Sequence, residues 1–285
     1  SKTPTPNLSR LADQGITFTD AHSSSSLCSP TRYGVLTGRY SWRSRRQGGA
    51  LWSFDPPLIE DGRLTVPQFL KNHGYHTAII GKWHLGLNWR DKNGNILENT
   101  GTEKGWNVDF SKPLENGPTA RGFDYFFGMD APNYPPYCYI ENDKTLGLPT
   151  LDKPTSMYGT PGIMLAGWEL SNVLPELERR VIKYIEEGAE NENPFFLYFP
   201  LTAPHTPIVP NQEHIGTSEA GPYGDFIHQV DAIVGNVMKT LERTGQADNT
   251  LLIFTSDNGS PRMDGTNMAG EMNSILKYGH KPSYI

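Results

Sequence analysis

A cysteine, a proline and an arginine occupy every second position, 28, 30 and 32, in the run Leu-Cys-Ser-Pro-Thr-Arg-Tyr at 27–33. A serine run at 23–26 precedes them and is typical of a loop. Because proline is tolerated in the first turn of a helix, a helix is expected to begin near Cys28, which then faces the positive end of the helix dipole. Arg32, one turn further on, adds a permanent positive charge. A thiol in that position is suited to chemistry on an anionic group.

The alternative for Cys28 is a small buried apolar side chain, which is the commoner role of an isolated cysteine. Two features favour the chemical role: serines surround the cysteine, and an arginine follows it at one-turn spacing. We expect Val35 and Leu36 to anchor the helix in a core and Gly38 to end it.

A lysine and a histidine follow a short apolar stretch at 76–80, which is rich in β-formers and is predicted to be a strand buried on both faces. In open α/β sheets, functional groups collect at the carboxyl ends of the strands. Lys82 and His84 occupy that position, and they point to the same side if the chain stays extended. The alternative is an ordinary surface strand end.

Two further apolar stretches, 194–200 and 250–255, are also predicted to be buried strands, and polar groups again follow each of them. His205 lies beyond the first, and Asp257 with Asn258 lies beyond the second. Taken singly, each signal is weak, because a histidine among prolines is usually a loop residue and Asp-Asn-Gly often forms a turn. One sheet topology would bring all of these groups to the same edge, which favours a shared site.

The elements that must position these groups alternate between helix and strand. This order predicts a wound α/β sheet with parallel central strands, and 285 residues suffice for one large α/β domain or two smaller ones. Helices are predicted at 6–15, 65–72, 174–189 and 224–244, and a further strand at 16–20.

Composition excludes several classes of function. The formal net charge is −6 and there is no basic block, which argues against a nucleic-acid partner. No apolar run approaches the length of a membrane span. Two cysteines give no disulfide framework, and Cys138 receives no role. The first residues are not a signal peptide, so no targeting segment indicates a compartment.

The Cys-x-Pro-x-Arg run, followed by Leu-Thr-Gly-Arg at 36–39, resembles the signature of type I sulfatases. Further matches to this family occur in the same order along nearly the whole chain: Gly-Lys-Trp-His-Leu-Gly at 81–86, Arg-Gly-Phe-Asp at 121–124, Pro-His-x-Pro at 204–207 and Ser-Asp-Asn-Gly at 256–259. The resemblance implies the alkaline-phosphatase-like α/β fold, in which helices cover both faces of a central mixed, mostly parallel sheet.

The resemblance also implies a role for each candidate residue. Cys28 would be oxidised after translation to formylglycine (3-oxoalanine), whose hydrate attacks the sulfur of a sulfate monoester. Arg32 would hold the hydrate and Lys82 would contact the sulfate. His205, also in contact with the substrate, would protonate the leaving oxygen. His84 would accept the proton whose loss regenerates the aldehyde.

A divalent cation belongs to the same implied site. Asp257, Asn258 and the modified Cys28 would bind it, and their oxygen donors favour Ca²⁺ over Mg²⁺. Members of the family complete this site with an Asp-Asp pair on an upstream strand, and this chain contains no Asp-Asp. A small C-terminal subdomain of the family is also absent. We therefore interpret residues 1–285 as a sulfatase catalytic domain truncated at both ends.

The function that the resemblance implies is hydrolysis of a sulfate ester on a sulfated carbohydrate or an aryl sulfate. Its implied protein partner is a formylglycine-generating or anaerobic sulfatase-maturing enzyme, and its family is mostly periplasmic, secreted or lysosomal. A phosphatase or phosphodiesterase of the same superfamily is an alternative, although such enzymes usually carry a Ser or Thr nucleophile and two zinc ions. An inactive sulfatase-like binding protein is a third reading, supported by the missing aspartate pair.

Overall fold

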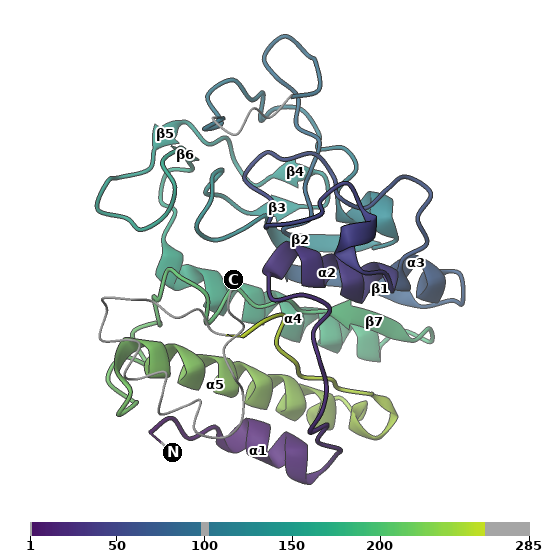
Figure 1. The fold of residues 1–285 in the computed structure, drawn as a ribbon. Coiled ribbons are helices and arrows are strands. Elements are labelled where there is room, and N and C mark those ends of the chain that lie inside the picture. Colours follow the sequence, from purple (N-terminus) through teal and green to yellow (C-terminus); the bar gives the residue numbers. More distant parts are fainter. Residues whose placement is uncertain (1, 98–102, 260–285) are drawn as a thin grey trace. The chain divides into compact units, whose positions relative to one another are not determined.

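The computed structural model describes residues 2–97 and 103–259, which belong to two compact units (Figure 1). The sheet unit comprises residues 27–170 and 192–202, and the helical unit comprises the described parts of 1–26, 171–191 and 203–285. Each unit is described by itself. No helix among the described residues has both the length and the apolar character needed to cross a membrane.

The sheet unit is built on a five-stranded mixed sheet in the order β4-β3-β2-β1-β7. Strand β1 runs parallel to both of its neighbours, β2 and β7, whereas β3 and β4 continue the sheet in antiparallel fashion. The strands span His76–Lys82 (β1), Tyr125–Met129 (β2), Ile140–Glu141 (β3), Lys144–Thr145 (β4) and Phe195–Tyr198 (β7). The α/β fold class with a mixed central sheet is therefore confirmed.

Strand β1 is buried along six of its seven residues, as its largely apolar sequence predicts for a central parallel strand. The backbone near the end of β1 lies very close to the adjacent segments of the chain. A Cβ on Gly81 would collide with the carbonyl of Pro200, and a Cβ on Gly128 would collide with the carbonyl of Gly81. Glycine is therefore required at both positions, Gly81 just before Lys82 on β1 and Gly128 opposite it on β2.

Helix α2 (Cys28–Thr37) begins at the cysteine and ends at Gly38, whose left-handed φ of 66° is the predicted helix stop. Leu36 is fully buried in the apolar core, together with Tyr33 and Ile79. The expectation that Val35 also anchors the helix is wrong, because Val35 lies on the outer face and is half-exposed.

The other elements of the sheet unit are short. Helix α3 (Val66–Lys71) packs on β1, and Thr65 caps it, since the Thr65 hydroxyl accepts a hydrogen bond from the Gln68 backbone N–H at 3.2 Å. The remaining bounds are Leu151–Asp152 (β5), Ile163–Met164 (β6), Ser41–Arg43 (η1) and Pro118–Arg121 (η2), and β5 and β6 pair as a separate two-stranded sheet.

The helical unit consists of α1 (Pro6–Asp13), α4 (Val173–Ala189) and α5 (Gly221–Arg243), and α5 packs against both of the others. The carboxylate of Asp231 accepts hydrogen bonds from the backbone of Asn7 and of Leu8, which ties the start of α1 to the middle of α5. The predicted helices are thus confirmed. Two short 3-10 turns complete the unit, Leu170–Asn172 (η3) at its border and Ala247–Asn249 (η4).

Two predicted strands are wrong. Residues 16–20 and 250–255 form no strand, and their large apolar side chains, such as Phe18, Leu251 and Ile253, are exposed. A strand is stabilised by a ladder with a neighbouring strand, and neither segment has one among the described residues. An apolar pattern alone was therefore insufficient to predict these strands.

The interpretation of residues 1–285 as one catalytic domain stays a prediction.

Candidate active site

The first turn of helix α2 is buried in the sheet unit. Cys28 is the first helical residue and is 9% exposed, and residues 29–33 after it are buried as well. The backbone N–H groups of a first helical turn have no partner within their own helix. The thiol therefore lies where a helix stabilises negative charge, as the sequence predicts.

Arg32 joins this helix to the end of β1. Its Nη1 donates a hydrogen bond of 2.8 Å to the backbone carbonyl of Lys82, and both residues are buried. A hydrogen bond from a charged donor is stronger than one between neutral groups. The charges of Arg32 and Lys82 both act on the buried carboxyl group of Asp130, so two cationic side chains lie in the same part of the interior. Buried cations favour an anionic ligand there.

The chain leaves the strand conformation just beyond Lys82. Backbone bonds fix this point, since the Lys82 N–H donates to the Pro200 carbonyl at 2.9 Å and the Trp83 N–H donates to the Met129 carbonyl at 2.8 Å. His84 then adopts a left-handed φ of 53°. The chain therefore does not stay extended as far as His84, which was the condition for Lys82 and His84 to share a side; both are buried at this end of β1.

His84 is oriented by the segment that follows η1. Its Nε2 lies 2.9 Å from the carbonyl oxygen of Leu51. A carbonyl only accepts hydrogen bonds, so we assign the Nε2 proton to this contact, and Nδ1 is then the basic atom of the neutral ring. The Leu51 N–H donates in turn to the hydroxyl of Ser29 at 3.2 Å. Leu51 thereby links the start of α2 to the histidine.

Asp130 is a buried carboxylate that the sequence analysis did not identify. It follows β2, and burial raises its pKa to about 7, while the charge of Lys82 and the backbone N–H of His84 act in the opposite direction. Among the described atoms, its Oδ1 has no hydrogen-bond partner. A carboxyl group with a pKa near neutrality beside a cationic pair is typical of a functional site.

An aromatic wall borders these polar groups. The ring of Tyr134 lies edge-on to His84 at 5.8 Å between centroids, and it packs at 5.5 Å against Trp52, which is half-exposed. Burial raises the pKa of Tyr134, and the nearby Cys28 and Asp130 raise it further. Tyr134 therefore lies close to both the thiol and the carboxyl group.

The remaining predicted residues belong to the helical unit. His205 is exposed, and its Nδ1 lies 2.6 Å from the Thr206 carbonyl oxygen, which assigns a proton to that nitrogen. Asp257 and Asn258 are half-buried. The side chain of Asn258 donates to the Gly259 carbonyl at 2.9 Å, so its amide oxygen is directed elsewhere.

Comparison with known proteins identifies the family. The family model described as Sulfatase matches residues 1–281. The chain belongs to the sulfatase family. It is 32% identical over 303 aligned residues to an N-acetylgalactosamine-6-O-sulfatase of Bacteroides thetaiotaomicron, covering 93% of this chain and 56% of that protein. It is 29% identical over 282 residues to the human N-acetylgalactosamine-6-sulfatase, covering 95% of this chain and 48% of that protein.

A solved structure agrees with this assignment. A sulfatase from work on the metabolism of multiple glycosaminoglycans by Bacteroides thetaiotaomicron has a TM-score of 0.81 and 30% identity, covering 99% of this chain and 62% of that chain. The predicted family and fold are therefore confirmed. This member of the sulfatase family spans about half the length of the curated relatives that it matches.

Within the sheet unit, this sulfatase-family chain brings together four of the seven predicted site residues, Cys28, Arg32, Lys82 and His84. Asp130 and Tyr134 join them from the segment after β2. Proximity of His205, Asp257 and Asn258 to this cluster stays a prediction.

The predicted calcium site is only partly represented. Asp257 and Asn258 provide the oxygen donors that Ca²⁺ prefers, but a calcium ion takes roughly six to eight ligands. Among residues 2–97 and 103–259, no group of three or more His, Cys, Asp or Glu side chains is arranged to hold a metal ion. The described donors therefore fit the ion in type and fall short in number.

Proposed function

We propose that the full-length protein hydrolyses the sulfate monoester of a sulfated saccharide. The observation that carries this proposal is the burial of Arg32 and Lys82 near one another: Arg32 donates a 2.8 Å hydrogen bond to the Lys82 backbone carbonyl, and both charges act on Asp130. A doubly charged cationic site at a helix N-terminus is suited to bind a sulfate group and to stabilise the charge that develops on its oxygens. Family membership and the names of the relatives support the same chemistry.

Four side chains have proposed roles in binding the sulfate, orienting residue 28 and transferring protons. Lys82 binds the sulfate oxygens, and Arg32 orients the group at position 28 while its bond to the Lys82 carbonyl keeps it in place. His84 accepts a proton at Nδ1, because its Nε2 proton is engaged by the Leu51 carbonyl. His205 donates a proton to the leaving oxygen from Nε2 of its doubly protonated ring, while Nδ1–H stays on the Thr206 carbonyl; this assignment rests on its motif.

Formylglycine at position 28 explains why the nucleophile is encoded as cysteine. Its hydrate would supply two hydroxyl groups on one carbon, one to act as the nucleophile and one to release the sulfate when deprotonated; an unmodified Ser or Cys has no second hydroxyl for this. We propose that a sulfatase-maturing enzyme introduces this group. The buried position of Cys28 supports modification before folding is complete.

We also propose that Asp257 and Asn258 hold a divalent cation, Ca²⁺, together with ligands outside the described residues. Its charge would neutralise the sulfate oxygens. Oxygen donors of both side chains suit a hard cation better than zinc. This preference separates the proposal from the two-zinc phosphatases of the same superfamily.

The full-length protein, expressed with a maturing enzyme, tests this function. Mass spectrometry of the peptide containing residue 28 is expected to show an aldehyde, and an aryl sulfate is expected to be hydrolysed much faster than the matched aryl phosphate. Cys28→Ala should abolish turnover, whereas Cys138→Ala, a matched change of the other cysteine, should retain it. A preference for phosphate, or full activity with an unmodified thiol, would overturn the proposal.

A further inference from the structure

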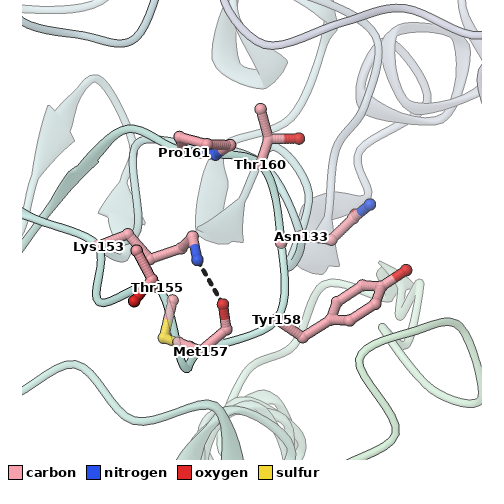
Figure 2. A pocket seen from close by; sticks show the side chains of 8 residues that line it. Asn133, Lys153, Thr155, Met157, Tyr158, Thr160 and Pro161 are labelled. Carbon is pink, nitrogen blue, oxygen red and sulfur yellow. Dashed lines mark hydrogen bonds between the residues drawn. The ribbon is translucent and has the colours of Figure 1, made fainter.

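A pocket of about 510 Å³ lies in the sheet unit, in the segment that contains β5 and the loop after it (Figure 2). This volume is within the range of roughly 300 to 1,000 Å³ that small-molecule sites occupy. Asn133, Lys153, Tyr158 and Thr160 are among the residues that line it. None of them belongs to the motifs that the family resemblance explains.

Tyr137 holds two walls of this pocket together. Its hydroxyl lies within hydrogen-bond distance of the carbonyls of Asn133, at 3.0 Å, and Thr160, at 2.6 Å. The Thr160 N–H donates to the Asn133 carbonyl at 2.9 Å as well. A Cβ on Gly159 would collide with the Tyr137 hydroxyl, so this wall is closely packed. The pocket is therefore formed before any ligand binds.

Lys153 places a positive charge in the pocket wall. The side chain is only 9% exposed, and its Nζ donates to the carbonyls of Pro154, at 2.9 Å, and Met157 (Figure 2). An ammonium group has three N–H donors, so one remains for a ligand. In the described part of the chain, no carboxylate forms an ion pair with Lys153. A buried charge is costly without a counter-ion, which favours an anionic ligand.

The other lining groups suit a sugar. Tyr158 is 54% exposed and offers an aromatic face, while the amide of Asn133 and the hydroxyl of Thr160 offer donors and acceptors. A sugar ring presents an apolar face together with hydroxyl groups, so this combination matches it.

The pocket borders the candidate active site. Asn133 directly precedes Tyr134, whose ring packs against His84. Tyr158 is also close enough to Tyr134 to raise its pKa. A saccharide whose sulfate lies beside Lys82 would therefore place its neighbouring ring near this pocket.

We propose that this pocket binds the sugar ring next to the sulfated one, and that Lys153 pairs with an anionic group on that ring. The inference rests on the proposed function for the position of the sulfate. The anionic group is a carboxylate or a second sulfate, since both offer oxygens to the same ammonium.

Binding to three disaccharides tests the proposal, measured by calorimetric titration of the full-length protein. The first joins a uronic acid to an unsulfated N-acetylhexosamine, the second is its carboxyl-reduced neutral analogue, and the third is that analogue with one sulfate on the reduced ring. We expect the first or the third to bind at least roughly tenfold more tightly than the second, as for a charge-assisted hydrogen bond. Equal affinities for all three, or no binding, would overturn it.

Variants locate the effect. Lys153→Met should remove the preference for the anionic probes over the neutral one. Tyr158→Ala, a change at an exposed ring, should weaken binding of all three probes but keep that preference. Lys144→Met, at an exposed lysine on β4, is the matched control and should bind as the wild type does. Discrimination that survives Lys153→Met in a folded variant would assign the charge to another residue and refute the proposal. The first two probes carry no sulfate, so their binding is read independently of any sulfatase activity.

Discussion

Replacing the buried Asp130 by asparagine should change how the stability of the chain depends on pH. The carboxyl group has an ordinary pKa of 3.8, which the folded protein raises to about 7, chiefly through burial. A raised carboxyl pKa means that the folded state holds a proton that the unfolded chain has already released. The stability contributed by protonated Asp130 is therefore present below pH 4 and is lost as the pH rises through 7.

The magnitude follows from the two pKa values. Between pH 4 and 7 the unfolding free energy of the wild type loses about 1.4 kcal/mol per pH unit from this group, or roughly 4 kcal/mol in all. Asp130→Asn keeps an oxygen that accepts from the His84 backbone but has no proton to release. The variant should thus gain stability relative to the wild type by an amount that grows to several kcal/mol at pH 8.

Urea denaturation at a series of pH values measures this difference, because other titrating groups contribute equally to both proteins. Asp91→Asn is a control of opposite sign. Hydrogen bonds from the Asn95 and Asn93 backbones lower the pKa of Asp91, so its removal should destabilise the protein more at pH 7 than at pH 3. A difference between Asp130→Asn and the wild type that stays constant from pH 4 to 8 would refute the reasoning.

Three further predictions test the fold and the site. Cys138 is buried and its burial raises the pKa of the thiol, so iodoacetamide at pH 8 should label it only in urea; rapid labelling of the native chain would contradict this burial. Gly128→Ala would force a Cβ against the Gly81 carbonyl and should cost several kcal/mol of unfolding free energy or abolish soluble expression, and a normal urea midpoint would show that the strands separate easily. In the full-length enzyme, His205→Gln should lower turnover of a saccharide sulfate by roughly 10²–10⁴-fold and that of nitrophenyl sulfate much less, because a good leaving group needs little protonation; equal losses on both substrates would remove the general-acid assignment.

Local chemistry explains what the sequence predicted well. Helix α2 begins at Cys28 and ends at Gly38 because a proline-tolerant first turn and a left-handed glycine are encoded within the segment itself. Strand β1 is recognisable because its middle residues 78–80 are apolar and rich in β-formers, as is typical of a central strand that is buried. The five motifs that occur in the family's order identified the family from the sequence alone.

What the sequence could not predict depends on distant partners. Asp130 looks like a loop residue, and it becomes a buried acid only because β2 pairs with β1 and places it beside Lys82. His84 was expected on an extended chain, but its φ is left-handed, and the residues just before it bond to Pro200 and Met129, which are distant in the sequence. Residues 250–255 have the composition of a buried strand, yet composition cannot supply the strand against which they would pair.

The acceptor for Arg32 is a main-chain oxygen, and this has a practical consequence for dissecting the two cations. Any side chain placed at position 82 retains that carbonyl, so a Lys82 variant loses one charge while the arginine keeps its anchor. An Arg32 variant, in contrast, removes a charge and also the hydrogen bond between helix α2 and the end of β1. Comparing the two substitutions therefore separates electrostatic attraction from mechanical support.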